Sequence, residues 1–203
     1  QNNCQGVIKS IASTPFTIRD AVPPVLTVST LSDGTYTNNQ VLNISGTATD
    51  NTGIKGVTIN GMAVQASADG TFSYALTLQS GPNAITTIAT DLAENQSTDT
   101  RTINLDMTAP DLKVTAPADN SKTGTALTEV KGTVDDVNAT VTVRLGNSTQ
   151  TAILTGNDFV ATVLLAPKDN TIEITATDLV TNTNSQKRSV FYDDQKPALA
   201  IID

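Results

Sequence analysis

The sequence predicts an all-β fold that consists of two tandem β-sandwiches of seven strands each. Thr, Asn, Asp, Ser and Gly recur throughout its 203 residues, whereas Trp and His are absent. This composition favours short strands and tight turns over helices. Apolar residues alternate with polar residues between turn signals, as in strands that bury one face. One phrase also occurs twice, at an interval close to the length of one small all-β domain.

The repeated phrase belongs to a longer repeated unit. NAITTIATDLAEN begins at Asn83 and NTIEITATDLVTN begins at Asn170, an interval of 87 residues. Two further pairs of segments repeat at nearly the same interval: LNISGTATD from Leu42 with TEVKGTVDD from Thr128, and FSYALTL from Phe72 with FVATVLL from Phe159. The chain therefore contains two copies of one domain.

Linkers that run from an aspartate to a proline bound the two copies. The pairs are Asp20 with Pro24, Asp106 with Pro110, and Asp193 with Pro197. These linkers predict a first domain at 21–106 and a second at 107–193. We interpret residues 1–20 as the end of a preceding domain or an N-terminal extension, and residues 194–203 as a linker and the first strand of a further unit.

Seven runs of alternating apolar residues predict the strands of the first domain. They span Val25 to Thr30, Val41 to Thr49, Ile54 to Asn60, Ala63 to Ser67, Thr71 to Leu78, Ala84 to Thr90 and Thr98 to Leu105. Asn60 with Gly61, and Asp69 with Gly70, suit two-residue hairpin turns because these residue types tolerate a left-handed backbone. The second domain has Gly146 with Asn147, and Gly156 with Asn157, at similar corners.

The same alternation predicts the side chains that each sandwich buries. In the first domain they are Ile44, Val57, Ile59, Phe72, Leu76, Ile85 and Ile88. In the second they are Val130, Val141, Val143, Phe159, Val163, Ile172 and Ile174. We expect these residues to pack in the core and to have no other role.

Charge and cysteine content restrict the possible partners. Acidic residues outnumber basic ones 20 to 12, the net charge is −8, and no basic cluster occurs. Phosphate backbones and anionic membrane surfaces are therefore unfavourable partners, and divalent cations are better ones. No apolar run approaches the roughly 18 residues of a membrane span. The single cysteine, Cys4, cannot form a disulfide within the chain, which leaves a free thiol or an intermolecular bond.

These segments together resemble bacterial immunoglobulin-like repeats of the kind found in large adhesins, surface-layer proteins and accessory regions of secreted enzymes. The resemblance rests on SGTATD and KGTVDD, on ATDLAEN and ATDLVTN, and on the aspartate-to-proline linkers, and it covers Asp20 to Asp193. It implies two immunoglobulin-like sandwiches and an extracellular or cell-surface location. The cysteine pair and tryptophan of antibody domains are missing, so antibody-type recognition is not implied.

The resemblance also suggests where acidic side chains gather. In such a sandwich the entering linker, the loop after the second strand and the loop before the last strand lie at one end. We expect two sets of ligands there, Asp20, Asp50, Asp91 and Asn95 in the first domain and Asp106, Asp136, Asp178 and Asn182 in the second. Clustered carboxylates repel one another unless a cation or hydrogen-bond donors neutralise them.

Calcium is the cation that these ligands suit, because it takes oxygen atoms from carboxylates, amides and main chain. Adhesin repeats that these domains resemble often carry calcium at such junctions, where the ion stiffens the linker. The alternative is that Asp91 and Asp178 accept hydrogen bonds from the amides of their own turns, while Asn95 and Asn182 adopt a left-handed backbone.

Catalysis is not expected from this sequence. Without histidine the usual proton shuttle is unavailable, and Asp135 with Asp136 are adjacent loop residues that would need a deep pocket to act as acid and base. A glycan platform built from Tyr36 and Tyr74 competes with a simple solvated strand face.

We expect instead a structural spacer that presents other domains of the same polypeptide. One alternative is a filament subunit joined to neighbouring copies by strand addition through its terminal segments, at 16–18 and 198–202. Another is an accessory module that binds an unidentified protein or glycan. No nucleic acid and no membrane insertion are expected.

Overall fold

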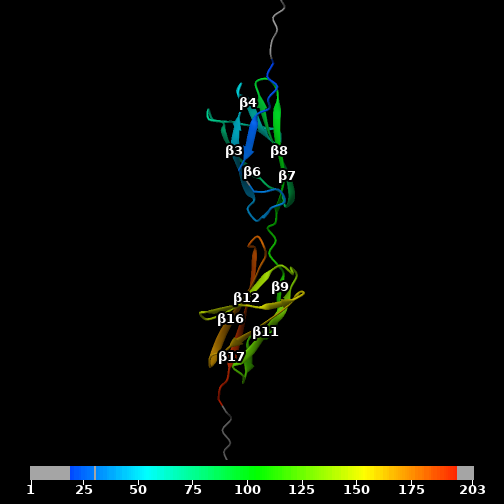
Figure 1. The fold of residues 1–203 in the computed structure, drawn as a ribbon. Coiled ribbons are helices and arrows are strands. Elements are labelled where there is room, and N and C mark those ends of the chain that lie inside the picture. Colours follow the sequence, from blue (N-terminus) through cyan, green and yellow to red (C-terminus); the bar gives the residue numbers. More distant parts are fainter. Residues whose placement is uncertain (1–18, 30, 196–203) are drawn as a thin grey trace, which may run out of the picture. The chain divides into compact units, whose positions relative to one another are not determined.

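The computed structural model describes residues 19–29 and 31–195, and every regular element in these ranges is a β-strand (Figure 1). None of the described residues forms a helix long and apolar enough to cross a membrane. Cys4 and the terminal segments at 16–18 and 198–202 lie outside the described residues. The strands form two sandwiches, which confirms the predicted all-β fold.

The first sandwich is built from eight strands in two sheets. They are β1 (Val25–Val28), β2 (Tyr36–Thr37), β3 (Val41–Thr49), β4 (Ile54–Ile59), β5 (Met62–Val64), β6 (Thr71–Thr77), β7 (Gly81–Asp91) and β8 (Gln96–Leu105). One sheet has the order β1-β3-β6 and the other the order β2-β8-β7-β4-β5. The turn between β4 and β5 has Asn60 at φ 49° and Gly61 at φ 78°, which confirms the predicted hairpin.

The second sandwich repeats this arrangement in its own two sheets. Its strands are β9 (Leu112–Ala116), β10 (Ser121–Thr123), β11 (Leu127–Val134), β12 (Thr140–Leu145), β13 (Ser148–Thr151), β14 (Ile153–Thr155), β15 (Asp158–Leu164), β16 (Lys168–Thr177) and β17 (Thr183–Tyr192). The sheet orders are β14-β15-β11-β9 and β10-β17-β16-β12-β13.

Each sandwich also contains a short strand that the sequence pattern did not predict. β2 pairs in parallel with the end of β8, and β10 pairs in parallel with the end of β17. Both strands have two or three residues and lack apolar alternation, so no periodic signal marks them. The first segment of each domain therefore contributes to both sheets, β1 and β9 to one and β2 and β10 to the other.

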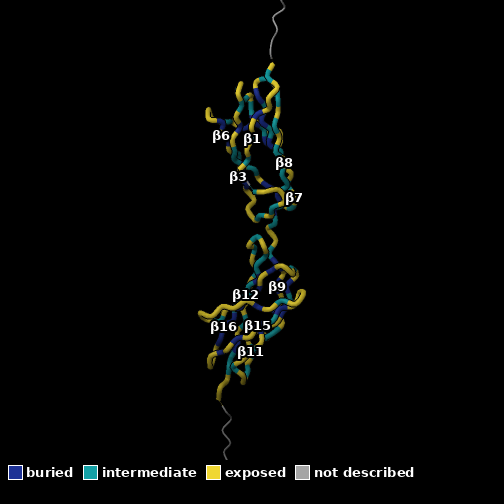
Figure 2. Tube along the Cα trace, in the orientation of Figure 1, coloured by how far each residue is buried: buried dark blue, intermediate teal, exposed yellow. Residues whose placement is uncertain are grey.

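Buried residues occur along the strands of each sandwich, dark blue in Figure 2, and form its core. All seven predicted core residues of the second domain are buried, from Val130 at 0% exposure to Val163 at 5%. In the first domain the prediction was wrong for Ile88, because Ile85, Thr87 and Ala89 take the inward positions of β7 and strict alternation turns Ile88 to the other face. Leu76 is also only half-buried.

The glycine in the repeated SGT and KGT segments allows the first strand to pack closely. A Cβ atom at Gly132 would lie 2.1 Å from the carbonyl oxygen of Lys113 on β9 and 2.6 Å from the ring of Phe159. Gly46 has the same surroundings, with Thr27 O at 2.1 Å and the Phe72 ring at 2.7 Å. The absence of a side chain at this point lets β9 and β11, or β1 and β3, pair beneath a core phenylalanine.

The substitution Gly132→Ala should lower the free energy of unfolding of the second sandwich by about 3 kcal/mol, because a backbone oxygen and a core ring must both move. Chemical denaturation measures this loss. Gly124→Ala is the matched control, because a Cβ atom there meets nothing within 4 Å. Equal stability of the two variants would contradict the close-packing account.

Candidate functional site

The repeated phrase forms a turn that is closed by its own aspartate. In the first sandwich the fully buried Asp91 accepts hydrogen bonds at Oδ1 from the amides of Ala93 and Asn95, both at 2.8 Å. Its Oδ2 accepts a third bond from the Asn95 side chain at 2.7 Å. These donors compensate the burial of the carboxylate.

The second sandwich has the same turn. Asp178 accepts hydrogen bonds from the amides of Val180 at 2.9 Å and Asn182 at 2.7 Å, and from the Asn182 side chain at 2.8 Å. The alternative prediction, that these aspartates cap their own turns, is therefore confirmed. The left-handed backbone was assigned to the wrong residue, because Glu94 and Thr181 carry the positive φ angles, 70° and 71°.

The two asparagines connect this turn to the linker that enters the domain. Asn95 Nδ2 donates to the carbonyl oxygens of Asp20 at 3.2 Å and Val22 at 3.4 Å, more than 70 residues earlier in the chain. Asn182 Nδ2 donates to the equivalent carbonyls, of Asp106 at 3.0 Å and of residue 108 at 3.4 Å. We call this turn, with the linker carbonyls it holds, the linker clip.

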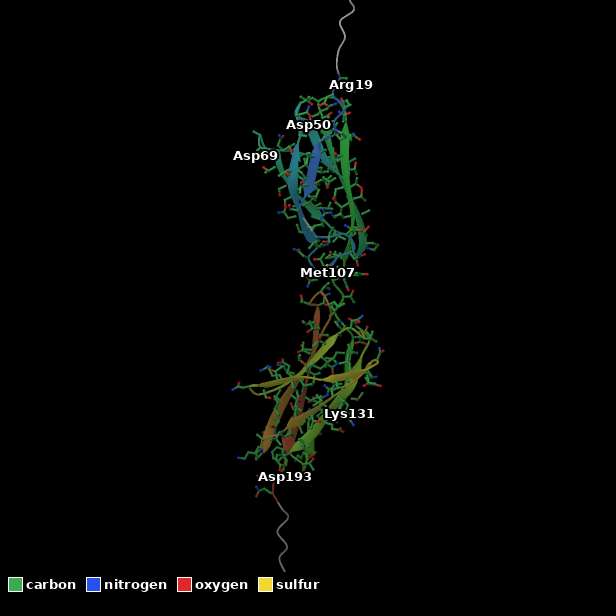
Figure 3. All side chains as sticks on the ribbon, viewed as in Figure 1. Arg19, Asp50, Asp69, Met107, Lys131 and Asp193 are labelled. Atoms are coloured by element: carbon green, nitrogen blue, oxygen red, sulfur yellow. The ribbon has the colours of Figure 1, made fainter. Side chains whose placement is uncertain are left out.

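The linker aspartates shape the segment that the clip holds. Asp20 Oδ1 accepts the amide of Val22 at 3.0 Å, and Asp106 Oδ1 accepts the amide of Thr108 at 3.0 Å. Asp193 makes the same bond with the amide of Gln195 at the exit from the second sandwich (Figure 3). The three linkers therefore begin with the same aspartate turn.

Beyond the clip, side chains of the last strand continue to bind the first segment. On β17, Asn184 donates to Pro110 O at 3.0 Å, Gln186 donates to Leu112 O at 2.6 Å, and Arg188 donates to Val114 O at 2.8 Å. We call this row, together with its counterpart on β8, the side-chain ladder.

On β8 the counterparts of Asn184 and Arg188 occupy the same positions in the repeat. Ser97 donates to Pro24 O, and Arg101 donates to Val28 O at 2.9 Å. These residues were not among those predicted from the sequence. Their signal is a polar side chain at every second position in the first half of the last strand, where an apolar one would be usual.

Three carboxylates predicted to meet in the first sandwich do so. One oxygen from each of Asp20, Asp50 and Asp91 lies within 4.8 Å of the other two. Figure 3 shows Asp50 at the end where the chain enters, near Arg19. The Thr52 hydroxyl lies 2.7 Å from Asp50 Oδ1 and 2.9 Å from Asp20 Oδ2. A hydroxyl carries one hydrogen, so it fully satisfies one of these two carboxylates at a time.

The equivalent carboxylates of the second sandwich, Asp106, Asp136 and Asp178, do not form such a group within the described part of the chain. The residue equivalent to Thr52 is Asn138, whose amide donates to Asp136 Oδ1 at 2.8 Å. The neighbouring Asp135 instead accepts the amide of Asp111 at 2.7 Å. The hydroxyl bridge of the first sandwich is therefore absent from this loop.

Asn95 and Asn182 were predicted to be cation ligands together with these aspartates, but their side-chain oxygens do not face the carboxylates. Each turns its amide nitrogen to the neighbouring carboxylate, which is the arrangement of a hydrogen-bond donor. A cation ligand would present the amide oxygen. The three aspartates of the first sandwich are thus the residues whose geometry leaves oxygen ligands close together.

Hydrogen bonds to the Asp50 carboxylate also affect its protonation. The hydroxyl of Thr52, followed by its amide, lowers the pKa of Asp50 below the ordinary value of 3.8. Asp69, in a separate turn, has its pKa lowered in the same way by Thr71. In both cases the ionised form receives the bonds.

The two candidate aromatic residues do not form a shared platform. Tyr36 is 62% exposed on β2, whereas Tyr74 is half-buried on β6. These strands belong to different sheets of the first sandwich. The two rings therefore give no single flat surface on which a sugar could stack.

Comparison with known proteins agrees with the duplicated unit. Residues 24–107 and 110–194 each match the family described as glucodextranase, domain B. The chain belongs to this domain B family. Its two copies correspond to the two sandwiches.

One relative and two solved structures extend this comparison. The chain is 34% identical over 137 residues to bacillopeptidase F of Bacillus subtilis (strain 168), a match that covers 66% of the chain and 9% of that relative. The fibronectin(III)-like modules of Clostridium thermocellum CbhA match 88% of the chain and 100% of that structure, with a TM-score of 0.56 and 13% identity. Extracellular domains 3–5 of Drosophila OTK match 83% of the chain and 62% of that structure, with a TM-score of 0.50 and 12% identity.

These likenesses confirm the resemblance to bacterial immunoglobulin-like repeats at the level of the fold. The chain spans about a tenth of the length of bacillopeptidase F, 9% of it. The domain B pair is therefore related to one part of that protein.

The substitution Thr52→Val should raise the pKa of Asp50 towards 3.8, because the largest cause of its lowering is lost. A lowered folded-state pKa stabilises the fold above the ordinary pKa, and this stabilisation disappears as the pH falls through the lowered value. The variant should therefore lose part of this acid-dependent stability. NMR titration of the carboxyl carbons measures the shift.

Thr71→Val is the matched control, since it should raise the pKa of Asp69 and leave that of Asp50 unchanged. An unaltered Asp50 titration in Thr52→Val would show that the hydroxyl bond does not form in solution.

Proposed function

We propose that this domain B pair is a non-catalytic spacer that holds other domains of its polypeptide, or neighbouring copies of the chain, at a set separation. The observation that carries this proposal is the linker clip, which occurs in both sandwiches with the same hydrogen bonds. A linker whose alternate carbonyls are hydrogen-bonded to the domain has few free torsions. Its length and direction are then more constant than those of a free linker.

The linker between the two domains is fastened at both of its ends. Its first residue, Asp106, donates its amide to Thr37 O at 2.9 Å. The Asn182 side chain holds the carbonyls of residues 106 and 108. This short fastened segment supports domain boundaries at 21–106 and 107–193, with Asp106 as the last residue of the first domain.

Several features support a role without catalysis. The chain has no histidine. A hollow of the second sandwich, about 780 Å³, is lined mainly by apolar and amide side chains such as Val143, Leu164 and Asn170. Asp169 is the one titratable residue among the described residues that line it. An acid–base pair in a closed pocket is therefore not formed there.

An extracellular or cell-surface location belongs to the same proposal. The matching family is named for a domain of a glucodextranase, and the relative is a bacillopeptidase, so the module accompanies enzymes of different chemistry. A domain shared by unrelated activities supports a spacing or presenting role.

The spacer proposal predicts a narrow distribution of distances between the two domains. Spin labels on Ala63→Cys and Thr149→Cys, both exposed sites, in a Cys4→Ser background report this distribution by double electron–electron resonance. Asn182→Ala should broaden it and lower the free energy of unfolding by about 2 kcal/mol, because two linker carbonyls and a carboxylate lose their donor.

Thr183→Ala, at an exposed neighbouring site, should leave the distribution unchanged. Light scattering on the unmodified chain should give the monomer mass, 21.1 kDa. A broad distribution in the unmodified chain would refute the spacer proposal, and growing polymers would favour assembly by strand addition.

We further propose that calcium binds the carboxylates of Asp20, Asp50 and Asp91 and stiffens the entry to the first domain. Oxygen atoms within 4.8 Å of one another suit a cation that prefers several oxygen ligands. The Thr52 hydroxyl contacts two of the carboxylates with one hydrogen, so a cation would relieve the remaining repulsion.

A chelator should lower the melting temperature of the chain, and added calcium should restore it. Titration calorimetry should detect one site that Asp50→Asn removes, because this change deletes one of the three charges. Asp136→Asn is the matched control at the equivalent position of the second sandwich and should leave calcium binding intact. A melting temperature that changes with neither chelator nor calcium would count against this site.

A further inference from the structure

The side-chain ladder joins two segments that run in the same direction. In the second sandwich, Asn184, Gln186 and Arg188 donate to the carbonyls of Pro110, Leu112 and Val114, in that order. Residue numbers therefore increase in the same direction along both segments. In the first sandwich Ser97 and Arg101 likewise bind Pro24 and Val28. The entering segment and the last strand of each domain are therefore parallel neighbours.

Main-chain pairing continues the same contact further along. β10 is parallel to β17, with Ser121 opposite Val190 and Thr123 opposite Tyr192. β2 is parallel to β8, with Tyr36 opposite Asn104. One parallel seam thus extends from the linker clip, through the ladder, to the exit of the domain.

This arrangement determines how a pull on the chain ends acts on each sandwich. The entering segment receives tension at its start and the last strand receives it at its end. Because the two are parallel neighbours, opposite pulls slide one along the other. All bonds across the seam are then strained together, whereas strands pulled apart sideways lose their bonds one after another.

We infer that the side-chain ladder is a tension-resisting seam that keeps each domain folded when its two ends are pulled apart. This function goes beyond the spacing role. It rests on that role in one respect: a spacer between other domains is what would be placed under tension. The ladder contributes side-chain bonds along the stretch where β9 and β17 lie in different sheets and share no main-chain pairing. Without it, the seam would keep only the linker clip at one end and the short β10–β17 and β2–β8 pairs at the other as the contacts described here.

Single-molecule stretching of the whole chain by its two ends tests the inference. The ladder variant Asn184→Ala with Gln186→Leu removes three bonds to the first segment, in the second sandwich only: those to Pro110 O and Leu112 O, and the one that Val114 N donates to Gln186 Oε1 at 3.4 Å. At a fixed force its unfolding rate should rise about fivefold for each bond removed, the factor that corresponds to a typical hydrogen bond. The unaltered first sandwich unfolds in the same molecule and provides an internal reference.

The control variant is Ser185→Ala with Lys187→Met, on the opposite face of the same strand. These side chains contact Thr175 and Glu173 of β16 and do not reach the first segment. This variant should change the unfolding rate under end-to-end tension by less than twofold. If the double ladder variant fails to fold, the unfolding rates of the single variants Asn184→Ala and Ser185→Ala under tension are compared instead.

Pulling direction supplies a second readout. With handles at Thr149 and at the C-terminus, tension does not enter through the first segment, so the ladder variant and the unmodified chain should unfold at similar rates. Equal acceleration by the ladder and control variants, or an acceleration independent of pulling direction, would overturn the inference. A chain that failed this test could still show the narrow distance distribution of a spacer, so the two failures are distinguishable.

Discussion

The structure of each domain depends on hydrogen bonds that the last strand donates, through side chains, to the main chain of the entering segment. The first strand pairs along one edge only, with β3 or β11, and leaves the carbonyls of its other edge without a strand partner. Main-chain carbonyls near a core need such partners. Asparagine, serine, glutamine and arginine side chains provide them, from Asn95 to Arg101 and from Asn182 to Arg188.

The first strand is thereby held from both sides at neighbouring residues. On one side the carbonyl oxygen of Lys113 lies against Gly132, which leaves no space for a side chain. On the other side Arg188 binds the carbonyl of the next residue, Val114. The first sandwich repeats this with Gly46 at Thr27 and Arg101 at Val28. The repeated glycine and the repeated arginine of the last strand therefore act on the same strand.

The two domains share the linker clip but differ in the loop that follows β3 in the first domain and β11 in the second. Thr52 links Asp20 and Asp50 through its hydroxyl, and the three carboxylates of the first domain lie close together. At the equivalent position Asn138 leaves Asp136 in a turn of its own. The two loops thus differ in the residue beside the acids and in whether the acids cluster, although the aspartates themselves occur in both copies.

The sequence by itself determined the fold class, the two repeated units and most of the core, because alternation and repetition are properties of neighbouring residues. It failed at Ile88, where a spacing of three from Ile85 already conflicted with strand geometry. It also singled out Asp91 and Asn95, yet the partners of Asn95 lie more than 70 residues away. Only the tertiary structure decided that this asparagine is a donor to the linker, and that Ser97, Asn184 and Gln186 continue the row. It also decided that, among the described residues, the acids gather in the first domain and not in the second. Those outcomes depend on which carbonyl or carboxylate a side chain reaches across the sandwich, and no local pattern encodes that distance.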